Sequence, residues 1–404
     1  MFRPLFMVLL ALLAPAADAA RTFAATASAP IRPEAEATGI DRALEGAVHD
    51  LCNHDVALLG EADHGDGTTV AFKVALVQRL VTRCHYNALF FEGSHYEFLN
   101  LSRRLRARQP VSPEQVATAI GGLWKFDREL APLIPFLAAQ AGSGRLRLGG
   151  IDDQLGGLGQ TYENDEMPAE LTAFLAAGRG AECREALHRR IYSESTNDAP
   201  ERARLQSCLA EIGDAVARSP ALDRPDREDL LEMVASAARF VARPTSDMVA
   251  YVHDRDRSMY LNFRWLADRL PPGSRIIVWA STSHIAKDGA VTGDYVGARN
   301  LGSYLHESYG RRAFALGFTA LGGAHFWTRR EPSRPIASAS PGSLEVLALS
   351  GSGADAAYLG TRQLRALGAV PGSMFLHRPV TASWASVLDG VVVFREEQPP
   401  HRID

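Results

Sequence analysis

Acidic residues and histidines directly follow four separate apolar runs in this sequence. A histidine can accept a proton near neutral pH, and a neighbouring carboxylate can orient its ring and stabilise its charged form. These residue types are suited to activating a water molecule for hydrolysis. We predict that Glu61, His64, Glu92 and His284 form the catalytic centre. The full set is Glu61 and His64 after the first run, Glu92 and His95 after the second, Asp152 after the third, and His284 after the fourth.

Several common catalytic motifs are missing from the sequence, which narrows the chemistry. There is no G-x-S-x-G nucleophile elbow, no H-E-x-x-H zinc motif, no P-loop and no strand-linked G-x-G-x-x-G. A seryl acyl-enzyme is therefore disfavoured. We predict a hydrolase that needs no metal and no cofactor.

Two alternatives stay open at this point. The first is a metal-dependent hydrolase, because Glu61/His64 and Glu92/His95 form two E-x-x-H pairs and His284 adds a candidate ligand. Both pairs follow predicted strands, so the helical geometry of di-iron proteins does not apply, but mixed carboxylate and imidazole ligands would suit Zn, Mn or Fe. The second is an exported protein that binds a large hydrophobic ligand without catalysis.

The chain alternates between short apolar runs and helical patterns, in which apolar residues recur every three or four positions. This alternation predicts an α/β fold with a mostly parallel sheet flanked by helices. Ligands in such sheets bind beyond the carboxyl ends of the strands, where the candidate residues lie. The predicted strands are Val56–Gly60, Ala88–Glu92, Arg145–Ile151, Arg275–Ala280, Ala313–Phe318, Leu344–Leu349 and Gly390–Phe394.

Residues 166–270 interrupt this alternation. They contain no convincing strand pattern and about four helical stretches, with a break near Pro244. We predict a helical insertion that forms a lid over the carboxyl ends of the strands. Residues 39–404 are otherwise predicted to be a single domain.

The N-terminal residues have the pattern of a secretory signal peptide. Arg3 gives a positive start, Leu5–Ala14 is an uncharged apolar run, and Ala17-Asp18-Ala19 is a small-x-small cleavage site. We predict a signal peptide over 1–19, a leader over 20–38, and an exported protein that is periplasmic or secreted. No later apolar stretch approaches the length of a transmembrane helix. The net charge of -4 gives no reason to expect nucleic acid or a membrane as a partner.

Export bears on the four cysteines, because an even number in an oxidising compartment predicts disulfides. Of the three pairings that four cysteines allow, we favour Cys52–Cys84 and Cys183–Cys208, since each pair flanks a compact unit. Buried free thiols are the alternative.

A series of short motifs resembles, in order, the erythromycin esterase family. The matched segments span roughly residues 40–330. The motifs are Gly60-Glu61-Ala62-Asp63-His64-Gly65, Phe72-Lys73, Phe91-Glu92, Trp124 with Arg128-Glu129, Gly150-Ile151-Asp152-Asp153-Gln154, Arg255-Asp256 or Asp256-Arg257, Trp279-Ala280 with His284-Ile285, and Gly317-Phe318.

The resemblance implies an α/β core with a helical lid and metal-independent hydrolysis of a macrolide lactone ester, which would give a role in antibiotic resistance. His64 would be the general base that activates water. Glu61 and Glu92 would orient the base, the water or the substrate. His284 would polarise the carbonyl or protonate the leaving alkoxide.

Other residues would support these four. Cationic side chains among them would hold the carboxylates of the cleft or stabilise an oxyanion. The predicted set of substrate-binding or supporting residues is Lys73, His95, Trp124, Arg128, Asp152 and Arg255.

Two positions depart from the family pattern. Ser281 stands where the family often has a second histidine, and His95 stands where no family histidine is expected. Both departures bear on the substrate. The prediction is therefore an erythromycin-esterase-like hydrolase of a small-molecule ester, with macrolides as one class to test.

Overall fold

A computed structural model describes residues 38–157, 160–192, 198–243, 246–292, 298–326 and 332–403. The predicted signal peptide and all of the predicted leader except Thr38 lie outside the described residues. Thr38 caps the first helix, α1 (Gly39–Leu51), through a reciprocal pair of hydrogen bonds with Asp41.

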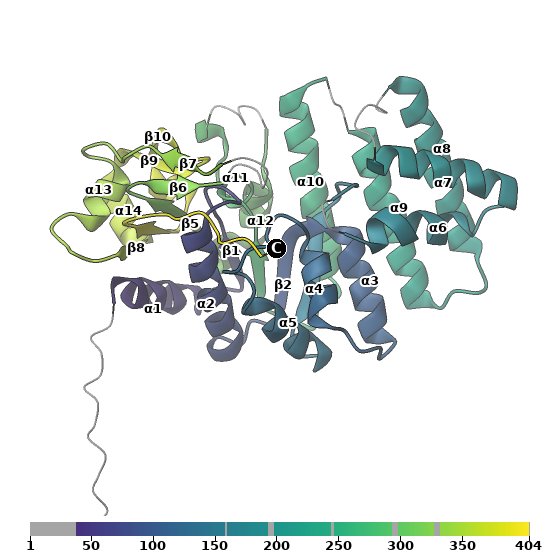
Figure 1. Cartoon of the computed structure of the whole chain (residues 1–404), viewed down its shortest axis with the longest axis horizontal. Coiled ribbons are helices and arrows are strands. Elements are labelled where there is room, and N and C mark those ends of the chain that lie inside the picture. The colour runs from purple at the N-terminus through teal and green to yellow at the C-terminus, as the bar shows by residue number, and fades with distance from the viewer. Residues whose placement is uncertain are drawn as a thin grey trace, which may run out of the picture. The chain divides into compact units, whose positions relative to one another are not determined.

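A seven-stranded sheet carries the fold (Figure 1). Six of its strands are parallel, and the edge strand β8 runs antiparallel to its neighbour β11, so the predicted mostly parallel sheet is confirmed. The fourth strand in the chain, β4, lies between β1 and β2. In spatial order the strands are β3 (Arg147–Asp152), β2 (Ala88–Ser94), β4 (Ile276–Trp279), β1 (Val56–Leu59), β5 (Ala313–Ala320), β11 (Gly390–Phe394) and β8 (Ala356–Gly360).

Helices cover both faces of the sheet because successive strand residues point to opposite sides. In β1, Ala57 and Leu59 face one core, whereas Val56 and Leu58 face the other. The first core is completed by α1, α2 (Gly67–Arg83), α4 (Pro113–Ile120) and α5 (Leu133–Gly142). The second core is completed by α10 (Met248–Ala267), α11 (Thr282–Ile285), α12 (Leu301–Tyr309), α13 (Leu344–Leu349), α14 (Thr361–Leu367) and α15 (Trp384–Val387).

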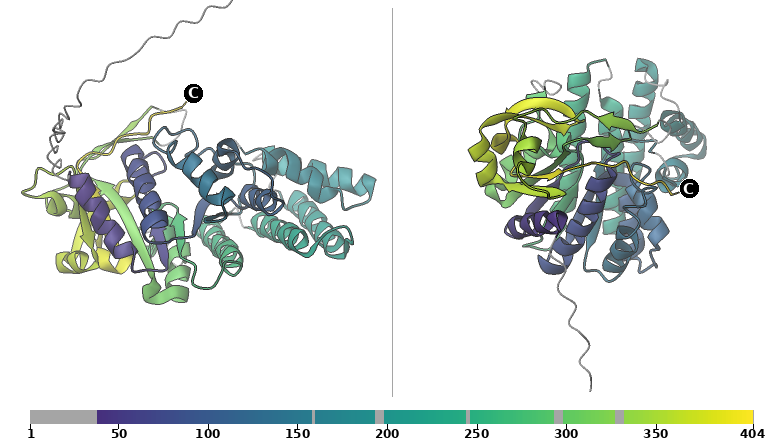
Figure 2. Two further views of the ribbon diagram at one scale, coloured as in Figure 1. Left: turned by 90° about the horizontal axis from the view of Figure 1, so that it is seen from below. Right: turned by 60° about the vertical axis from the view of Figure 1, so that its left-hand side comes forward.

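The described part of 166–270 is helical and contains no strand. Its first helices pack on Tyr96 and Leu99 of α3 (His95–Arg106), at the β3 end of the sheet (Figures 1 and 2). Helix α10 then returns along β3 and carries side chains to the carboxyl ends of the strands. Pro244, the predicted break, lies outside the described residues, between α9 and α10. The preceding helices are α6 (Met167–Thr172), α7 (Ala177–Tyr192), α8 (Ala199–Arg218) and α9 (Arg224–Ala242).

One predicted strand is wrong. Residues Leu344–Leu349 form helix α13, whose N-cap Ser343 accepts a hydrogen bond from the backbone N–H of Val346. A short apolar run fits a buried strand or a buried helix equally well, and here the serine cap decides for the helix. Sequence analysis also did not predict β8 or four short strands, which are β6 (Gly323–His325), β7 (Arg334–Ile336), β9 (Ala369–Phe375) and β10 (Arg378–Ser383).

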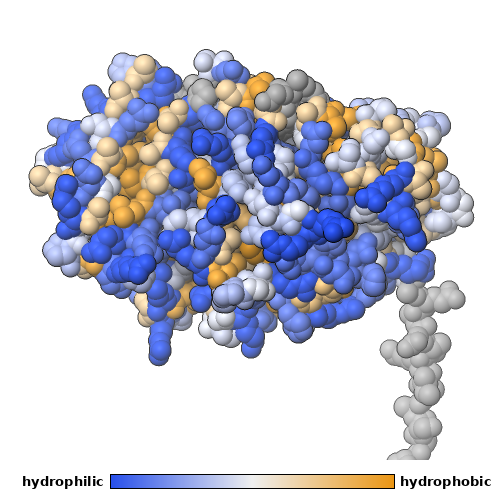
Figure 3. Space-filling model, turned by 180° about the vertical axis from the view of Figure 1, so that it is seen from behind, coloured by the Kyte–Doolittle hydropathy of each residue, from blue (hydrophilic) through white to orange (hydrophobic). Residues whose placement is uncertain are grey.

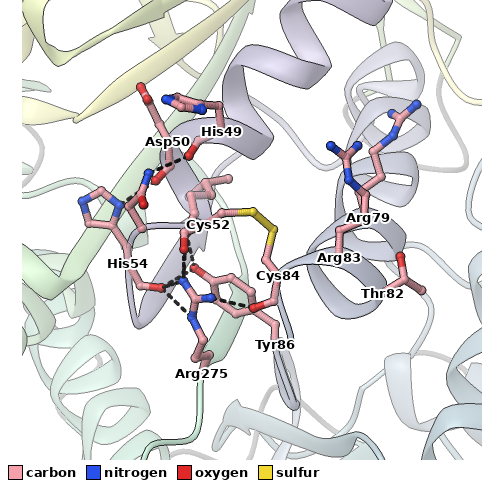
Figure 4. Close-up of a disulfide and its surroundings, with 12 residues drawn as sticks. His49, Asp50, Cys52, His54, Arg79, Thr82, Arg83, Cys84, Tyr86 and Arg275 are labelled. Atoms are coloured by element: carbon pink, nitrogen blue, oxygen red, sulfur yellow. Dashed lines mark hydrogen bonds between the residues drawn. A yellow bond between two sulfur atoms is a disulfide. The ribbon is translucent and has the colours of Figure 1, made fainter.

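Both favoured cysteine pairings, Cys52–Cys84 and Cys183–Cys208, are disulfides in the structure. Figure 4 shows Arg275 beside the first of them. Its guanidinium donates to the carbonyl oxygen of Cys84 at 2.6 Å and to that of His54 at 2.6 Å. The guanidinium also lies over the ring of Tyr86. The disulfide and this arginine together tie the start of β4 to the ends of α1 and α2.

The face seen in Figure 3 is mainly polar, with apolar residues in small separate groups. Among the described helices, none combines the length and the hydropathy that crossing a membrane requires.

Candidate active site

Glu61 and His64 lie on the loop that follows β1. The Nδ1 atom of His64 is 2.7 Å from Oε1 of Glu61. Glu61 is fully buried, whereas the His64 side chain is 33% exposed, so the histidine is the accessible member of the pair. The loop passes very close to α11, since a Cβ atom at Gly60 would lie 2.5 Å from Oγ1 of Thr282.

Two further donors hold Glu61. Lys73 of α2 donates from Nζ to Oε2 at 2.8 Å, and Trp124 donates from Nε1 to Oε1 at 3.0 Å. The Lys73 side chain is fully buried and lies 4.1 Å from the ring centroid of Trp279. Burial lowers the pKa of Lys73, and the carboxylate of Glu61 opposes that shift. Three donors therefore fix both oxygens of Glu61.

Glu92 reaches the site from an irregularity in β2. The pairing with β3 shifts by one residue between Phe91 and Ser94, which is the signature of a β-bulge. Bulges re-aim side chains at the ends of strands, and here Glu92 points toward the neighbouring strand ends. Its Oε2 accepts the backbone N–H of Ser281 at 2.9 Å, so β2 and β4 meet through this carboxylate.

Arg255 of α10 joins three strand ends. It donates from Nη2 to Oδ2 of Asp152 at 2.7 Å and to Oε1 of Glu92 at 2.9 Å. Its Nη1 lies 3.1 Å from Nε2 of His284. Burial would raise the pKa of Glu92, but His284 and His64 in their protonated forms, together with Arg255, hold it well below its usual range.

His284 is held from behind by a carboxylate, as His64 is. Its Nδ1 is 2.9 Å from Oδ1 of Asp256, which also accepts the backbone N–H of Leu301 at 2.8 Å. Its Nε2 is 3.2 Å from Oε1 of Glu92. The side chain is only 6% exposed, so His284 forms the floor of the site.

The two histidines face each other across Glu92. The Nε2 atom of His64 lies 3.9 Å from Oε1 of Glu92, which is too far for a direct hydrogen bond and close enough for both atoms to contact one water molecule. A cavity of about 240 Å³ opens beside Glu92 and Asp152, and Leu123, Gln154 and Gln160 also line it. A small group in this cavity would contact Glu92, the carboxylate that lies between the two histidines.

The hydrogen bonds define which nitrogen of each histidine is reactive. A carboxylate at Nδ1 requires that nitrogen to carry the proton, so the lone pair of the neutral ring lies on Nε2. For His64, Nε2 faces the partly open space beside Glu92. For His284, Nε2 accepts from Arg255 when neutral and can donate to Glu92 when protonated. The site thus has one exposed proton acceptor and one enclosed group able to return a proton.

Two predicted supporting residues lie apart from this cluster. His95 is fully buried, with Nδ1 2.8 Å from the carbonyl oxygen of Gly150 and Nε2 3.8 Å from Glu232 of α9. Burial lowers its pKa to about 3. Arg128 is exposed, and its described contact with the chain terminus is a backbone hydrogen bond to His401. The six other predicted residues beyond Glu61 and His64 meet in the cluster, namely Lys73, Glu92, Trp124, Asp152, Arg255 and His284.

Asp256 was not predicted as a site residue. Of the Arg255-Asp256 motif only Arg255 was predicted to support the site, because a helical sequence does not tell which of two adjacent residues faces a strand end. In the structure Arg255 and Asp256 both do, because α10 passes between Glu92 on one side and His284 with α12 on the other.

A family model for erythromycin esterases matches residues 81–396. The chain belongs to the erythromycin esterase family. This assignment makes the protein a member of a hydrolase family and agrees with the predicted resemblance.

Solved structures of low sequence identity share the family fold. A Bacillus cereus protein is 16% identical, with a TM-score of 0.69 over 91% of this chain and 94% of its own. A succinoglycan biosynthesis protein is also 16% identical, with a TM-score of 0.69 over 89% and 92% of the two chains. The erythromycin esterase EreC, in an open conformation, is 16% identical, with a TM-score of 0.65 over 89% and 95%.

One curated relative is similar in sequence. The Bacillus subtilis protein named "Putative hydrolase YbfO" is 29% identical over 150 residues. That stretch covers 35% of this chain and 32% of YbfO, so the chain matches about a third of the length of this relative.

Proposed function

We propose that the protein is an exported carboxylic-ester hydrolase in which His64 activates water for attack on an ester or macrolide lactone. The observation that carries this proposal is the orientation of His64: Glu61 binds its Nδ1, while its Nε2 faces Glu92 across 3.9 Å in a partly open space. A general base must reach the proton that it removes, and this geometry leaves room for one water molecule there.

The proposed reaction uses the residues as follows. His64 takes a proton from water through Nε2, and the resulting hydroxide attacks the carbonyl carbon. Arg255 stabilises the negative charge on the carbonyl oxygen. The C–O bond then breaks. The leaving alkoxide takes the proton back from the imidazolium of His64, or takes one from protonated His284, which regains it from His64 before the next turnover. Asp256 and Glu61 stabilise the two imidazolium ions.

The internal charges of the site favour chemistry without a metal in this cluster. Lys73 binds Glu61 and Arg255 binds Glu92, so each central carboxylate already has a cation. The similarity to EreC supports a macrolide lactone or a related ester as substrate, and this would give a role in the response to antibiotics. Two disulfides support an oxidising compartment such as the periplasm, because disulfides persist there.

A hydrolysis screen over macrolide lactones and small esters, with and without a chelator, tests this proposal. We expect turnover that is insensitive to the chelator and is reduced about 10²- to 10⁴-fold in His64→Ala, the range for loss of a general base. Arg128→Ala is the matched control and should keep full activity, because its side chain is exposed and no described hydrogen bond joins it to the cluster. Undiminished turnover by His64→Ala would contradict the assignment of the base.

A further inference from the structure

A second group of carboxylates and histidines lies beside the loop that carries His64. Asp66 ends this loop, His325 ends β6, and His377 lies in the turn between β9 and β10. The ligating atoms of these three residues lie within 4.8 Å of one another. The backbone also joins these segments, since Phe326 donates to the carbonyl of Gly65 and Leu376 donates to the carbonyl of Ala62.

The side chains of this second cluster converge. The Nε2 atom of His377 is 2.8 Å from Oδ1 of Asp66, and the two imidazole rings are 4.6 Å apart. Asp63 approaches from the same loop, with its Oδ2 3.6 Å from Nδ1 of His325. Two imidazoles and two carboxylates thus share one small volume.

Three polar atoms in this volume are buried without a hydrogen-bond partner among the described residues. They are Oδ2 of Asp63, Nδ1 of His325 and Nδ1 of His377. The three side chains are 5%, 9% and 5% exposed. Buried polar atoms nearly always have a partner, because leaving one unsatisfied costs about 1–3 kcal/mol. Oδ2 of Asp63 and Nδ1 of His325 face each other at 3.6 Å, which is too long for a hydrogen bond, and a cation bound between them would satisfy both.

The residue types of the cluster indicate that this ligand is a cation. Within the described ranges, no lysine or arginine forms an ion pair with Asp63 or Asp66, whose ion-pair partners are His325 and His377. The candidate active site differs, because Lys73 and Arg255 form ion pairs with its carboxylates. Imidazole nitrogens together with carboxylate oxygens are ligands for divalent transition metals, and Zn²⁺ accepts this combination readily.

The turn that presents His377 has an unusual backbone. Leu376 and His377 have φ angles of 51° and 54°, in the left-handed region that few residues other than glycine occupy, although asparagine, aspartate and histidine are enriched there. The two residues form the tight turn that places the imidazole of His377 beside Asp66.

We propose that Asp66, His325 and His377, assisted by Asp63, bind one divalent transition-metal ion, for which Zn²⁺ is the probe. The ion would join the loop of the base to β6 and to the β9–β10 turn. It would thus hold the main chain on either side of His64, without contributing to the proton transfers proposed above. This inference does not rest on the proposed function.

Metal binding to the whole protein tests this inference. The protein is stripped with a chelator, dialysed and titrated with ZnCl₂ by calorimetry, and with Co²⁺ by visible absorption. We expect one equivalent of metal per chain and a melting temperature that rises with Zn²⁺ concentration, as mass action requires for a ligand of the folded state. A wild-type chain that binds no stoichiometric Zn²⁺ or Co²⁺ would overturn the proposal.

Two variants locate the metal. We expect His377→Asn and His325→Gln each to weaken Zn²⁺ binding by at least about 10- to 100-fold, since even outer contacts of a metal site have effects of that size. Asparagine tolerates the φ of position 377, so His377→Asn decides the question even if His325→Gln fails to fold. The control is His306→Asn, which removes a histidine paired with a carboxylate, Asp389, that Lys287 already compensates.

The outcomes distinguish metal binding at this site from metal binding at the candidate active site. Unchanged Zn²⁺ affinity in His377→Asn would overturn the proposal, and so would binding that is lost in His284→Asn but kept in His377→Asn. Ester hydrolysis is measured separately on the same samples. A failure of the metal site therefore leaves the assignment of His64 standing, and a failure to hydrolyse esters leaves the metal binding standing.

Discussion

The site contains two histidine–carboxylate pairs that differ in what surrounds them. His64 is backed by Glu61 and is one-third exposed, and its Nε2 has no direct hydrogen bond to any of the described residues. His284 is backed by Asp256 and is nearly buried, with Nε2 within 3.2 Å of both Arg255 and Glu92. The two pairs therefore differ at Nε2, which is accessible in His64 and enclosed by other side chains in His284. In the proposed mechanism, access to Nε2, rather than the histidine–carboxylate pair itself, distinguishes the base that activates water from the histidine that returns a proton.

The carboxylates behind the histidines also differ. Both oxygens of Glu61 accept hydrogen bonds, from His64 and Trp124 on one side and from Lys73 on the other. In Asp256, Oδ1 accepts two hydrogen bonds, but Oδ2 is buried with no partner among the described residues. An amide should therefore replace Asp256 more easily than it replaces Glu61.

Glu61→Gln should have the largest effect. The NH₂ group of the glutamine must face either the Lys73 ammonium or the donors His64 and Trp124. In the second arrangement it donates to Nδ1 of His64 and forces the proton of the ring onto Nε2. The wrong tautomer removes the base, so we expect kcat to fall about 10³- to 10⁴-fold. Steady-state kinetics on the best ester of the screen measures this, and circular dichroism verifies the fold. A decrease smaller than that of the matching Asp256 variant would reverse the comparison.

Asp256→Asn should have a smaller effect. The asparagine oxygen can keep both hydrogen bonds of Oδ1, while its NH₂ occupies the unpartnered position of Oδ2. His284 keeps its tautomer and loses only the negative charge that stabilises its protonated form. We expect kcat to fall about 10- to 100-fold, below the usual loss for a removed general base. If kcat falls as far as in Glu61→Gln, His284 rather than His64 would be the base.

The smallest effect is a shift with pH. Burial lowers the pKa of His64, but the hydrogen bond to Glu61 and the charges of Glu92 and Glu61 raise it to about 8. A base must be unprotonated, so kcat/KM should rise with pH and level off above an inflection near 8. A pH profile measures this. A profile that falls through the same inflection would make protonated His64 the active form.

The raised pKa of His64 also makes the free energy of unfolding depend on pH, in the direction opposite to that of activity. Because the folded pKa lies above that of an ordinary histidine, protonated His64 stabilises the fold fully below about pH 6.5, and this contribution is lost as the pH rises through about 8. Activity should therefore increase over the pH range in which this contribution to the free energy of unfolding decreases.

Sequence patterns were sufficient for the parts of the fold that are periodic and buried. Six of the seven predicted strands are present, and Glu61, Glu92, Asp152 and His284 were placed together because each follows one of them. Patterns did not predict the direction in which a side chain points, and this direction decides whether a residue joins the site. Glu92 lies near the end of β2 and His95 directly follows it, but His95 starts helix α3 and points to Gly150 and Glu232.

The second cluster shows the same limit. Asp66, His325 and His377 come from a loop, a short strand and a turn that are more than 250 residues apart at the extremes. The sequence gives none of them a motif, and His377 resembles any turn residue. Only the antiparallel pairing of β9 with β10 brings it back to the loop after β1.

The place of β4 in the sheet has a consequence for when the protein can become active. β1 and β2 lie on either side of β4 and do not pair with each other, so the sheet between Glu61 and Glu92 is incomplete until residues 276–279 have been synthesised. A nascent chain that ends within the insertion lacks this central strand, and with it His284. Under the proposed function we therefore expect no ester hydrolysis from a chain truncated before β4, because such a chain lacks both the central strand and His284.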